Sequence, residues 1–198
     1  MLNDRTPKAG VPKGRAIVQG IVLLARFRVA GLAQFTGTVP DLLNSLAPLL
    51  AFPAVLALLL LLDGGGVGAL SDLLSLVVGL LGPLVISQAL AARWGRDEAW
   101  LRYAVAFNWC QWVLPLAAMA LVLLFSVLAA MGLPQQLLVP GALLSVGFYA
   151  LALHWFLARR GLDLSRVQAT LFVVAVNAGT GTLMLLPRVM RGWLEGGA

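Results

Sequence analysis

The sequence RWGRDEAWLRYAVAFNWCQWVLP, residues 93–115, separates two hydrophobic blocks and indicates how the chain is organised. It carries five charged residues in its first ten positions and four of the six tryptophans of the chain. In a continuous helix, side chains at spacings of three and four would share one face. The residues on that face are Arg93, Arg96, Trp100 and Tyr103. Charged, then aromatic, then apolar residues are typical of a helix that passes from a membrane surface into lipid.

The composition indicates an integral membrane protein. Of the 198 residues, 61% are apolar and 11% are charged, and the mean hydropathy is +0.94. An ordinary globular domain carries about 25% charged residues, so this chain could not cover a soluble surface. The net charge of +6 does not point to nucleic acid, because the basic residues fall in the N-terminal segment and in short connectors. A lone cysteine, Cys110, excludes an internal disulfide.

Apolar stretches long enough to cross a bilayer, which takes about 20 residues, predict an all-α, polytopic fold with five transmembrane helices. The first four expected spans are residues 42–62, 73–92, 104–131 and 137–157. The fifth begins at a capping box formed by Ser165 and Gln168 and ends near Pro187. We therefore divide the chain into three parts. Residues 1–36 are a cytoplasmic tail and interfacial helix, 37–187 the five-helix transmembrane domain, and 188–198 a short C-terminal tail.

The N-terminal part has a different character from the spans. Residues 1–14 contain two prolines, two glycines and several charges, which predicts a disordered tail. Residues 15–35 are apolar but interrupted by Arg15, Arg26 and Arg28. An arginine at the centre of a span costs roughly 2.5–3.5 kcal/mol, so an amphipathic helix lying in the membrane interface is favoured. A helix packed beneath its own bundle is the alternative.

Lysine and arginine counts predict the orientation. Twelve of the fourteen basic residues lie in the N-terminal region, the connector between the second and third spans, and the connector between the fourth and fifth. These regions alternate as five spans require if the N-terminus is cytoplasmic. Two residues of the C-terminal tail, Arg188 and Arg191, disagree with this arrangement. An Ala/Leu/Arg/Gly-rich composition suggests a bacterial source, and hence the cell inner membrane.

The spans contain small residues and amides rather than charges. Pairs of small residues four apart favour close helix packing, and the expected packing residues are Gly141, Ser145, Ala175 and Gly179. Three amides, Asn108, Gln111 and Asn177, form a candidate polar cluster within the membrane. They could contact a solute, but hydrogen bonding between helices is the favoured interpretation.

Chemistry that needs ionisable groups is weakly supported by this sequence. No Asp, Glu, Lys or Arg occurs between Tyr103 and Ala158, which argues against a proton-coupled pump. The only histidine, His154, lies near the cytoplasmic end of its span, where a ring anchored at the interface is the ordinary interpretation. We expect no catalytic residue, no metal site and no cofactor, and therefore no enzyme.

The N-terminal cytoplasmic segment, the five closely spaced spans and the connector WGRDEAWLRYAVAFNWCQWVLP, which ends in Pro115, resemble the Yip-domain superfamily of five-span membrane proteins, in particular its bacterial branch. The resemblance covers roughly residues 35–186, mostly by topology. Eukaryotic members bind small GTPases and shape secretory membranes. Their Asp-Leu-Tyr-Gly-Pro run is reduced here to Gly82-Pro83, and for bacterial relatives the resemblance implies no reaction.

We therefore expect a non-enzymatic scaffold or accessory subunit that binds other membrane proteins, including further copies of itself, or lipid. An uncoupled channel or small-solute transporter lined by the amides is the alternative. The connector offers a candidate interaction surface for anionic lipid headgroups or an acidic partner segment. Its residues are Arg93, Arg96, Trp100, Arg102 and Tyr103. No nucleic acid partner is expected.

Overall fold

The computed structural model describes residues 13–62, 66–132 and 134–196. Within these ranges the chain is helical, and five of its segments are long and apolar enough to cross a membrane. The elements are α1 (Lys13–Ala25), the 3₁₀ helix η1 (Val29–Gln34), α2 (Val39–Leu62), α3 (Gly66–Arg93), α4 (Asp97–Cys110), α5 (Val113–Ala130), α6 (Gln135–Gly161) and α7 (Arg166–Gly196). The predicted disordered tail falls almost wholly on residues 1–12, outside the described residues.

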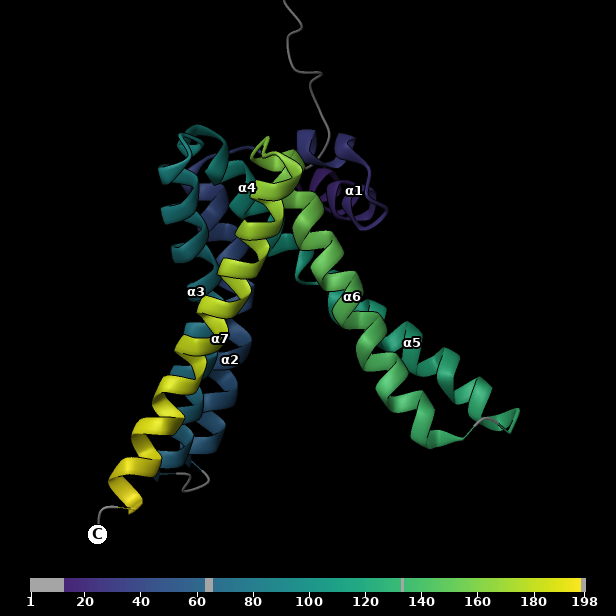
Figure 1. The fold of residues 1–198 in the computed structure, drawn as a ribbon, viewed down its shortest axis with the longest axis vertical. Helices are drawn as coiled ribbons and strands as arrows, with labels where there is room; N and C mark the ends of the chain where they lie inside the picture. Colours follow the sequence, from purple (N-terminus) through teal and green to yellow (C-terminus); the bar gives the residue numbers. More distant parts are fainter. Residues whose placement is uncertain (1–12, 63–65, 133, 197–198) are drawn as a thin grey trace, which may run out of the picture.

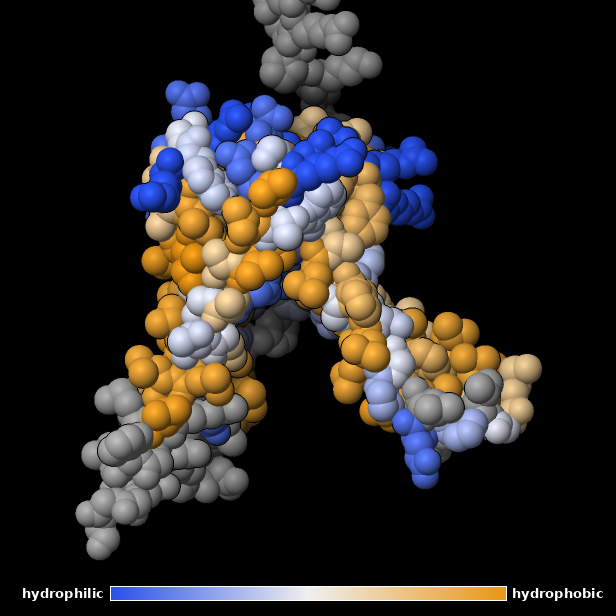
Figure 2. All heavy atoms as spheres, viewed as in Figure 1, coloured by the Kyte–Doolittle hydropathy of each residue, from blue (hydrophilic) through white to orange (hydrophobic). Residues whose placement is uncertain are grey.

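Two helical arms diverge from a common end (Figure 1). Helices α2, α3 and α7 form a three-helix arm, and α5 and α6 form a two-helix arm. Helices α1 and α4 lie at the common end, where the α3–α4 and α6–α7 connections also lie. Hydrophilic residues gather there, whereas the visible face of the arms is largely apolar, apart from hydrophilic residues at the foot of the two-helix arm (Figure 2). We call this the basic end. The segments predicted to share one side of a membrane therefore do lie together.

The predicted third span is broken into two helices. Helix α4 ends at Cys110 and α5 begins at Val113. Pro115 explains the break, because its ring cannot donate a hydrogen bond to the Gln111 carbonyl and clashes with it. That carbonyl instead accepts from the Leu114 N–H at 3.3 Å. The third span predicted over residues 104–131 lies within the candidate span Asp97–Ala130 apart from its last residue, but the turn before Pro115 divides it into two helices. The break separates the common end from the two-helix arm.

The N-terminal segment folds back on itself at the basic end. Helix α1 stops at Ala25 and η1 runs antiparallel to it, at a distance that only glycine allows. A Cβ on Gly31 would lie 2.8 Å from the Gly20 carbonyl oxygen and 2.7 Å from Leu24 Cγ. Leu24 and Phe35 are buried in the core, and α1 contacts α4. The segment is therefore not one helix over 15–35, and it packs against its own bundle. One face, which includes Val18, stays exposed.

Helices α3 and α7 pack closely along the three-helix arm. A Cβ on Gly79 would lie 3.1 Å from the Met184 side chain, and Ser75 Oγ donates to the Met184 carbonyl at 3.3 Å. Small residues on α3 thus let α7 approach, as membrane helices commonly do. Helix α7 continues past Pro187 to Gly196, but its apolar candidate span is Arg166–Leu186, which confirms the predicted end of the fifth span near Pro187. Membrane helices tolerate such prolines.

The core is concentrated at the basic end. Buried residues there come from α1, η1, α3, α4, α6 and α7, whereas the described part of α5 buries only Val113. The arms instead expose large apolar side chains along their length. This is the pattern expected of helices that face lipid rather than water.

Candidate functional site

Helix α4 is the centre of the molecule, and its polar side chains reach three neighbouring helices. Trp100 Nε1 donates to Ser87 Oγ of α3 at 3.0 Å, and Asn108 Nδ2 donates to Ser45 Oγ of α2 at 3.0 Å. Tyr103 Oη lies 3.0 Å from His154 Nε2 of α6. All three α4 side chains are at least nine-tenths buried. Helix α4 is therefore held by hydrogen bonds as well as by packing.

The two serines have a common arrangement. Ser45 Oγ donates to the Leu42 carbonyl at 2.7 Å, and Ser87 Oγ donates to the Leu84 carbonyl at 2.9 Å. Each hydroxyl thus gives its hydrogen to its own helix and accepts from α4. A hydroxyl has one hydrogen and two lone pairs, so both groups are satisfied without water. Asn108 accordingly serves helix association, the interpretation favoured from the sequence.

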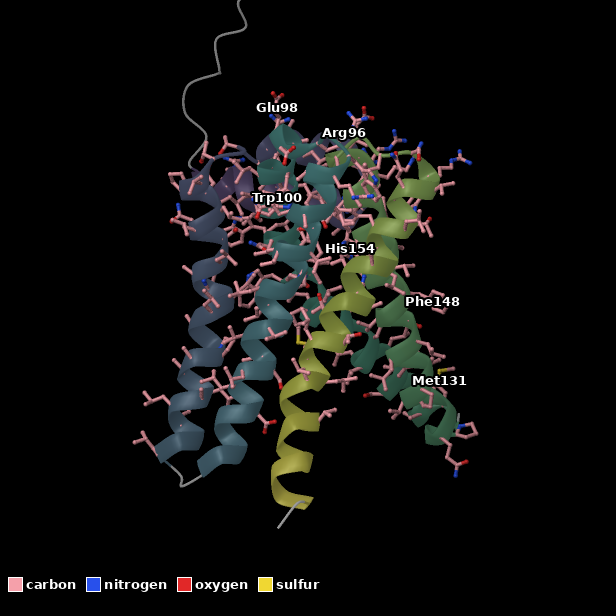
Figure 3. All side chains as sticks on the ribbon, turned by 60° about the vertical axis from the view of Figure 1, so that its left-hand side comes forward. Arg96, Glu98, Trp100, Met131, Phe148 and His154 are labelled. Atoms are coloured by element: carbon pink, nitrogen blue, oxygen red, sulfur yellow. The ribbon has the colours of Figure 1, made fainter. Side chains whose placement is uncertain are left out.

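His154 joins three helices. Asn177 Nδ2 donates one hydrogen to the Val173 carbonyl at 2.7 Å and lies 3.1 Å from His154 Nδ1. The second amide hydrogen therefore points to Nδ1, which must accept. His154 then carries its hydrogen on Nε2 and donates to Tyr103 Oη, a tautomer inferred from the bonding pattern. The chain Tyr103–His154–Asn177 links α4, α6 and α7, with His154 inside the bundle (Figure 3).

Aromatic rings surround His154. The Phe107 ring centroid lies 4.8 Å from that of His154, and Phe172 packs edge-on at 6.0 Å. His154 is only 6% exposed. The expectation of a ring anchored at the membrane interface is therefore wrong. Helix α6 continues from the histidine to Gly161, nearly two turns further on.

A cavity of about 110 Å³ opens beside this histidine. We call it the apical cavity, because it lies where the two arms meet. Its walls come from α4, α5, α6 and α7 and are largely apolar. They are formed by Phe107, Cys110, Gln111, Leu114, Ala150, Leu151, Leu153, His154, Leu157 and Asn177. Below it the arms separate and leave an open space, the inter-arm cleft (Figure 2).

The predicted amide cluster is divided by the structure. Gln111 and Asn177 line the apical cavity together, although they come from different helices. Asn108 does not reach it, because its side chain turns to Ser45 on the other side of α4. Asn108 and Gln111 are three residues apart in the sequence, yet Asn108 reaches α2 and Gln111 lines the apical cavity.

The predicted interaction surface on the connector is not one surface. Helix α3 ends at Arg93, and Gly95 adopts a positive φ of 65° that begins a new direction. Trp100 and Tyr103 then face the core, at 8% and 1% exposure, while Arg93 and Arg102 stay exposed. The expectation that cations and rings share an exposed face is therefore wrong.

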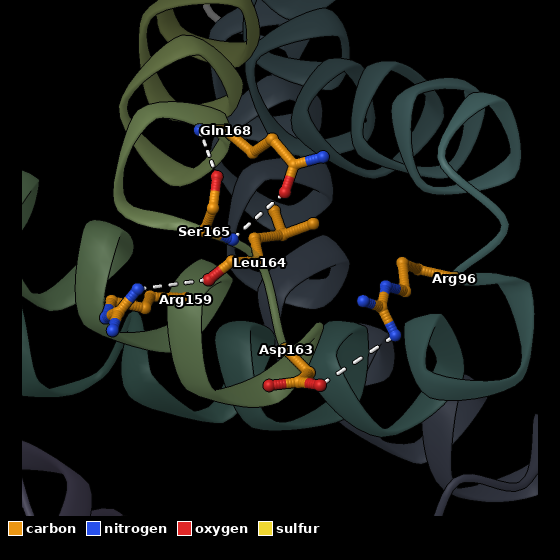
Figure 4. Close-up of polar contacts among 6 residues, drawn as sticks. All are labelled: Arg96, Arg159, Asp163, Leu164, Ser165 and Gln168. Carbon is orange, nitrogen blue, oxygen red and sulfur yellow. Dashed lines mark hydrogen bonds and ion pairs between the residues drawn. The ribbon is translucent and has the colours of Figure 1, made fainter.

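The remaining connector contacts lie at the α6–α7 junction (Figure 4). Arg96 Nη1 is 3.8 Å from Asp163 Oδ2, a loose pair between exposed side chains. The predicted capping box is confirmed: Gln168 N–H donates to Ser165 Oγ at 3.2 Å and Ser165 N–H to Gln168 Oε1 at 3.0 Å. The junction is thus fixed locally.

The predicted packing residues have mixed outcomes. A Cβ on Gly179 would lie 2.8 Å from Ile86 Cδ1 of α3, so this glycine does sit at a close helix contact. Gly141 faces Phe125 of α5 at an ordinary 3.7 Å. Ser145 and Ala175 are exposed, and Ser145 Oγ donates to its own helix. The spacing alone could not tell which pair faced a neighbour.

No family model, curated protein or solved structure matches the chain. The site is therefore interpreted from its own geometry. Sequence reasoning did not single out Ser45 or Ser87, and it assigned His154 to the membrane surface. A buried partner for Trp100 Nε1 could have been expected, because a buried indole N–H needs an acceptor.

Proposed function

We propose that the protein is a non-enzymatic integral membrane protein that acts as a scaffold or accessory subunit and binds another membrane protein or lipid between its two arms. The inter-arm cleft carries this proposal. The apical cavity at its top has largely apolar walls and holds hydrogen-bonding groups from Gln111 and Asn177. A membrane-embedded binding partner matches such a site better than a water-soluble one, because apolar walls disfavour water.

Small residues on both cleft walls support a close-fitting occupant. Gly147 lies four positions before Leu151 on α6, and Gly181 lies four after Asn177 on α7, so both continue the faces that line the apical cavity. A Cβ at either glycine would meet nothing within 4 Å. Another helix or an acyl chain could therefore approach these two backbones directly.

The closed basic end favours a binding role over a conduit. Above the apical cavity, Tyr103, Phe172 and Leu157 are fully buried and fill the space between α4, α6 and α7. A solute entering from the cleft would meet this plug. The uncoupled channel or transporter remains the second candidate, because the Gln111 and Asn177 amides do line the cavity.

In the proposed setting the five apolar helices span the bacterial inner membrane, with the basic end in the cytoplasm. The likeness to the Yip-domain superfamily agrees with a non-enzymatic role. In this orientation the cleft opens toward the outer side of the membrane and laterally into lipid.

A photo-crosslinking experiment tests the proposal. A photoreactive amino acid is placed at Gly147 or Gly181, with the exposed Val85 of α3, outside the cavity walls, as the matched control. The proposal expects a defined protein or lipid adduct from the two cleft positions at several times the control yield. Equal yields at the three positions would remove its basis. If no adduct forms, and the reconstituted protein conducts a solute flux that the Gln111→Leu substitution abolishes, the protein is a transporter instead.

A further inference from the structure

The turn that joins α1 to η1 places two exposed arginines on either side of a phenylalanine. The three residues Arg26, Phe27 and Arg28 form this arginine turn. Its backbone is fixed by two hydrogen bonds. Phe27 N–H donates to the Leu24 carbonyl at 2.8 Å and Arg28 N–H to the Leu23 carbonyl at 2.9 Å. Two bonds of this kind form a Schellman motif, so the arginines project from a defined helix end rather than from a loose loop.

Phe27 occupies a position that favours glycine. Its φ is 55°, in the left-handed region, where a side chain costs roughly 1–2 kcal/mol. The ring supplies compensating contacts, since it packs edge-on against Tyr149 at 5.8 Å and Phe156 at 5.6 Å. Tyr149 Oη also donates to the Ala25 carbonyl at 2.9 Å. These contacts lock the arginine turn against α6.

A third exposed arginine belongs to the same surface. Phe156 and Arg160 are four residues apart on α6 and so lie on one face, the face that packs on Phe27. No acidic residue occurs between positions 5 and 40, so nothing within that segment neutralises the turn. Asp163 is the acidic residue nearest in sequence to Arg160, but its Oδ2 pairs with Arg96 Nη1 at 3.8 Å. Arg26, Arg28 and Arg160 therefore make a patch of three cations.

Apolar side chains are exposed next to these cations. Phe27 is 41% exposed and Val29, the next residue but one, is 48% exposed. Val22, one turn before the end of α1, is also exposed. Cations beside exposed apolar groups match a lipid that has an anionic headgroup above an acyl chain.

We propose that Arg26, Arg28 and Arg160 form a binding site for the headgroup of an anionic phospholipid, whose acyl chain lies against Phe27 and Val29. Guanidinium groups suit this role, because their planar donors match phosphate oxygens in pairs. The site lies outside the inter-arm cleft. It requires membrane insertion but not an occupant of the cleft, so the two proposals can fail separately.

Native mass spectrometry of the full chain, released from detergent with added phosphatidylglycerol or phosphatidylcholine, tests the site. Three variants are compared with the wild type. The turn variant carries R26Q, R28Q and R160Q, and a lysine variant carries R26K, R28K and R160K. The connector variant carries R93Q, R102Q and R166Q, which removes the same charge from exposed arginines elsewhere at the basic end.

The wild type should bind phosphatidylglycerol in preference to phosphatidylcholine. The affinity of the turn variant for phosphatidylglycerol should be at least about tenfold lower, because each basic residue near an anionic surface raises the affinity about fivefold. The connector variant should lose less than about threefold. Rising salt should narrow the difference. Equal losses in both glutamine variants would show general charge attraction and overturn the site.

Two further measurements distinguish the proposed site from a site for other ligands and from misfolding of the variant. Inorganic phosphate that displaces the lipid completely at equal concentration would show an ion site and overturn the lipid assignment. A turn variant that melts below the wild type in phosphatidylcholine has lost structure. In that case the lysine variant decides: retained preference for phosphatidylglycerol supports the site, and loss of the preference despite three cations overturns it.

Discussion

Replacing Gly179 with leucine should separate α7 from α3. A Cβ on this glycine would already lie 2.8 Å from Ile86 Cδ1, closer than real Cβ atoms come to another side chain. Alanine could be accommodated by rotation of the Ile86 end group, because that atom terminates a flexible chain. Leucine adds three more carbons beyond the Cβ, and α7 must move or Ile86 must leave its position.

The expected loss follows from the cost of overpacking a closely packed interface. Such insertions commonly cost about 1–3 kcal/mol. At about 2–4 °C per kcal/mol for a chain of this size, Tm should fall by roughly 2–12 °C. Gly179→Ala should lie near the lower end of that range or below it.

Two variants control for effects unrelated to the contact. Gly181→Leu makes the same change two residues further along α7, where a Cβ would meet nothing within 4 Å, so its Tm should stay close to that of the wild type. Ile86→Ala removes three carbons from the opposing helix. Combined with Gly179→Leu, it should recover part of the loss, with a coupling energy of about 1–2 kcal/mol.

Thermal unfolding in a mild detergent, followed by tryptophan fluorescence, measures these differences. Equal Tm values for Gly179→Leu and the wild type would mean that this face of α7 does not contact α3. Equal losses in Gly179→Leu and Gly181→Leu would show that leucine disturbs α7 generally. Either result would refute the reasoning from the Ile86 distance.

Three further predictions concern hydrogen bonds and topology. Tyr103→Phe leaves the buried His154 Nε2–H without its acceptor and should lower the free energy of unfolding by about 1–3 kcal/mol, more than Tyr149→Phe at a half-buried site; similar losses in urea or SDS titrations would show that burial does not strengthen the Tyr103–His154 bond. Asn108→Leu should lower the free energy of unfolding by about 0.6–2 kcal/mol through loss of the hydrogen bond to Ser45, whereas Gln111→Leu, in the cavity wall, should change it little. A larger loss for Gln111→Leu than for Asn108→Leu would contradict the assignment of Asn108 to the helix contact. In a Cys110→Ala background, a cysteine replacing Met131, at the far end of the two-helix arm, should react with an impermeant thiol reagent added outside the cell (Figure 3). A cysteine replacing Glu98, at the basic end, should not react, because the basic end is expected in the cytoplasm. The opposite labelling pattern would reverse the orientation.

Features that depend on neighbouring residues along the chain could be predicted well. Hydropathy and length locate the five candidate spans, because a run of apolar side chains needs no knowledge of distant residues. The Ser165–Gln168 capping box formed as its spacing indicated. The gathering of the basic segments at one end also follows from the alternation of spans and connectors.

Features that depend on helix crossing were predicted only in part. Gly179 faces a neighbour while Ala175, four residues before it, is exposed, although the spacing treats them alike. Trp100 and Tyr103 appeared to belong to a surface, yet α4 is surrounded by other helices at the basic end. Periodicity shows which side chains share a face, but not which helix that face will meet.

By itself, the sequence determined that the chain is helical and that five of its helices are long and apolar enough to span a membrane. It also determined that the basic connectors lie together. Hydropathy, length and the alternation of spans and connectors can all be read along the chain. Only the tertiary structure decided that Pro115 separates a buried α4 from an exposed arm, that His154 bridges Tyr103 and Asn177, and that the arginine turn rests on α6. Each of these depends on residues far apart in the chain, whose distances are fixed only when the helices pack.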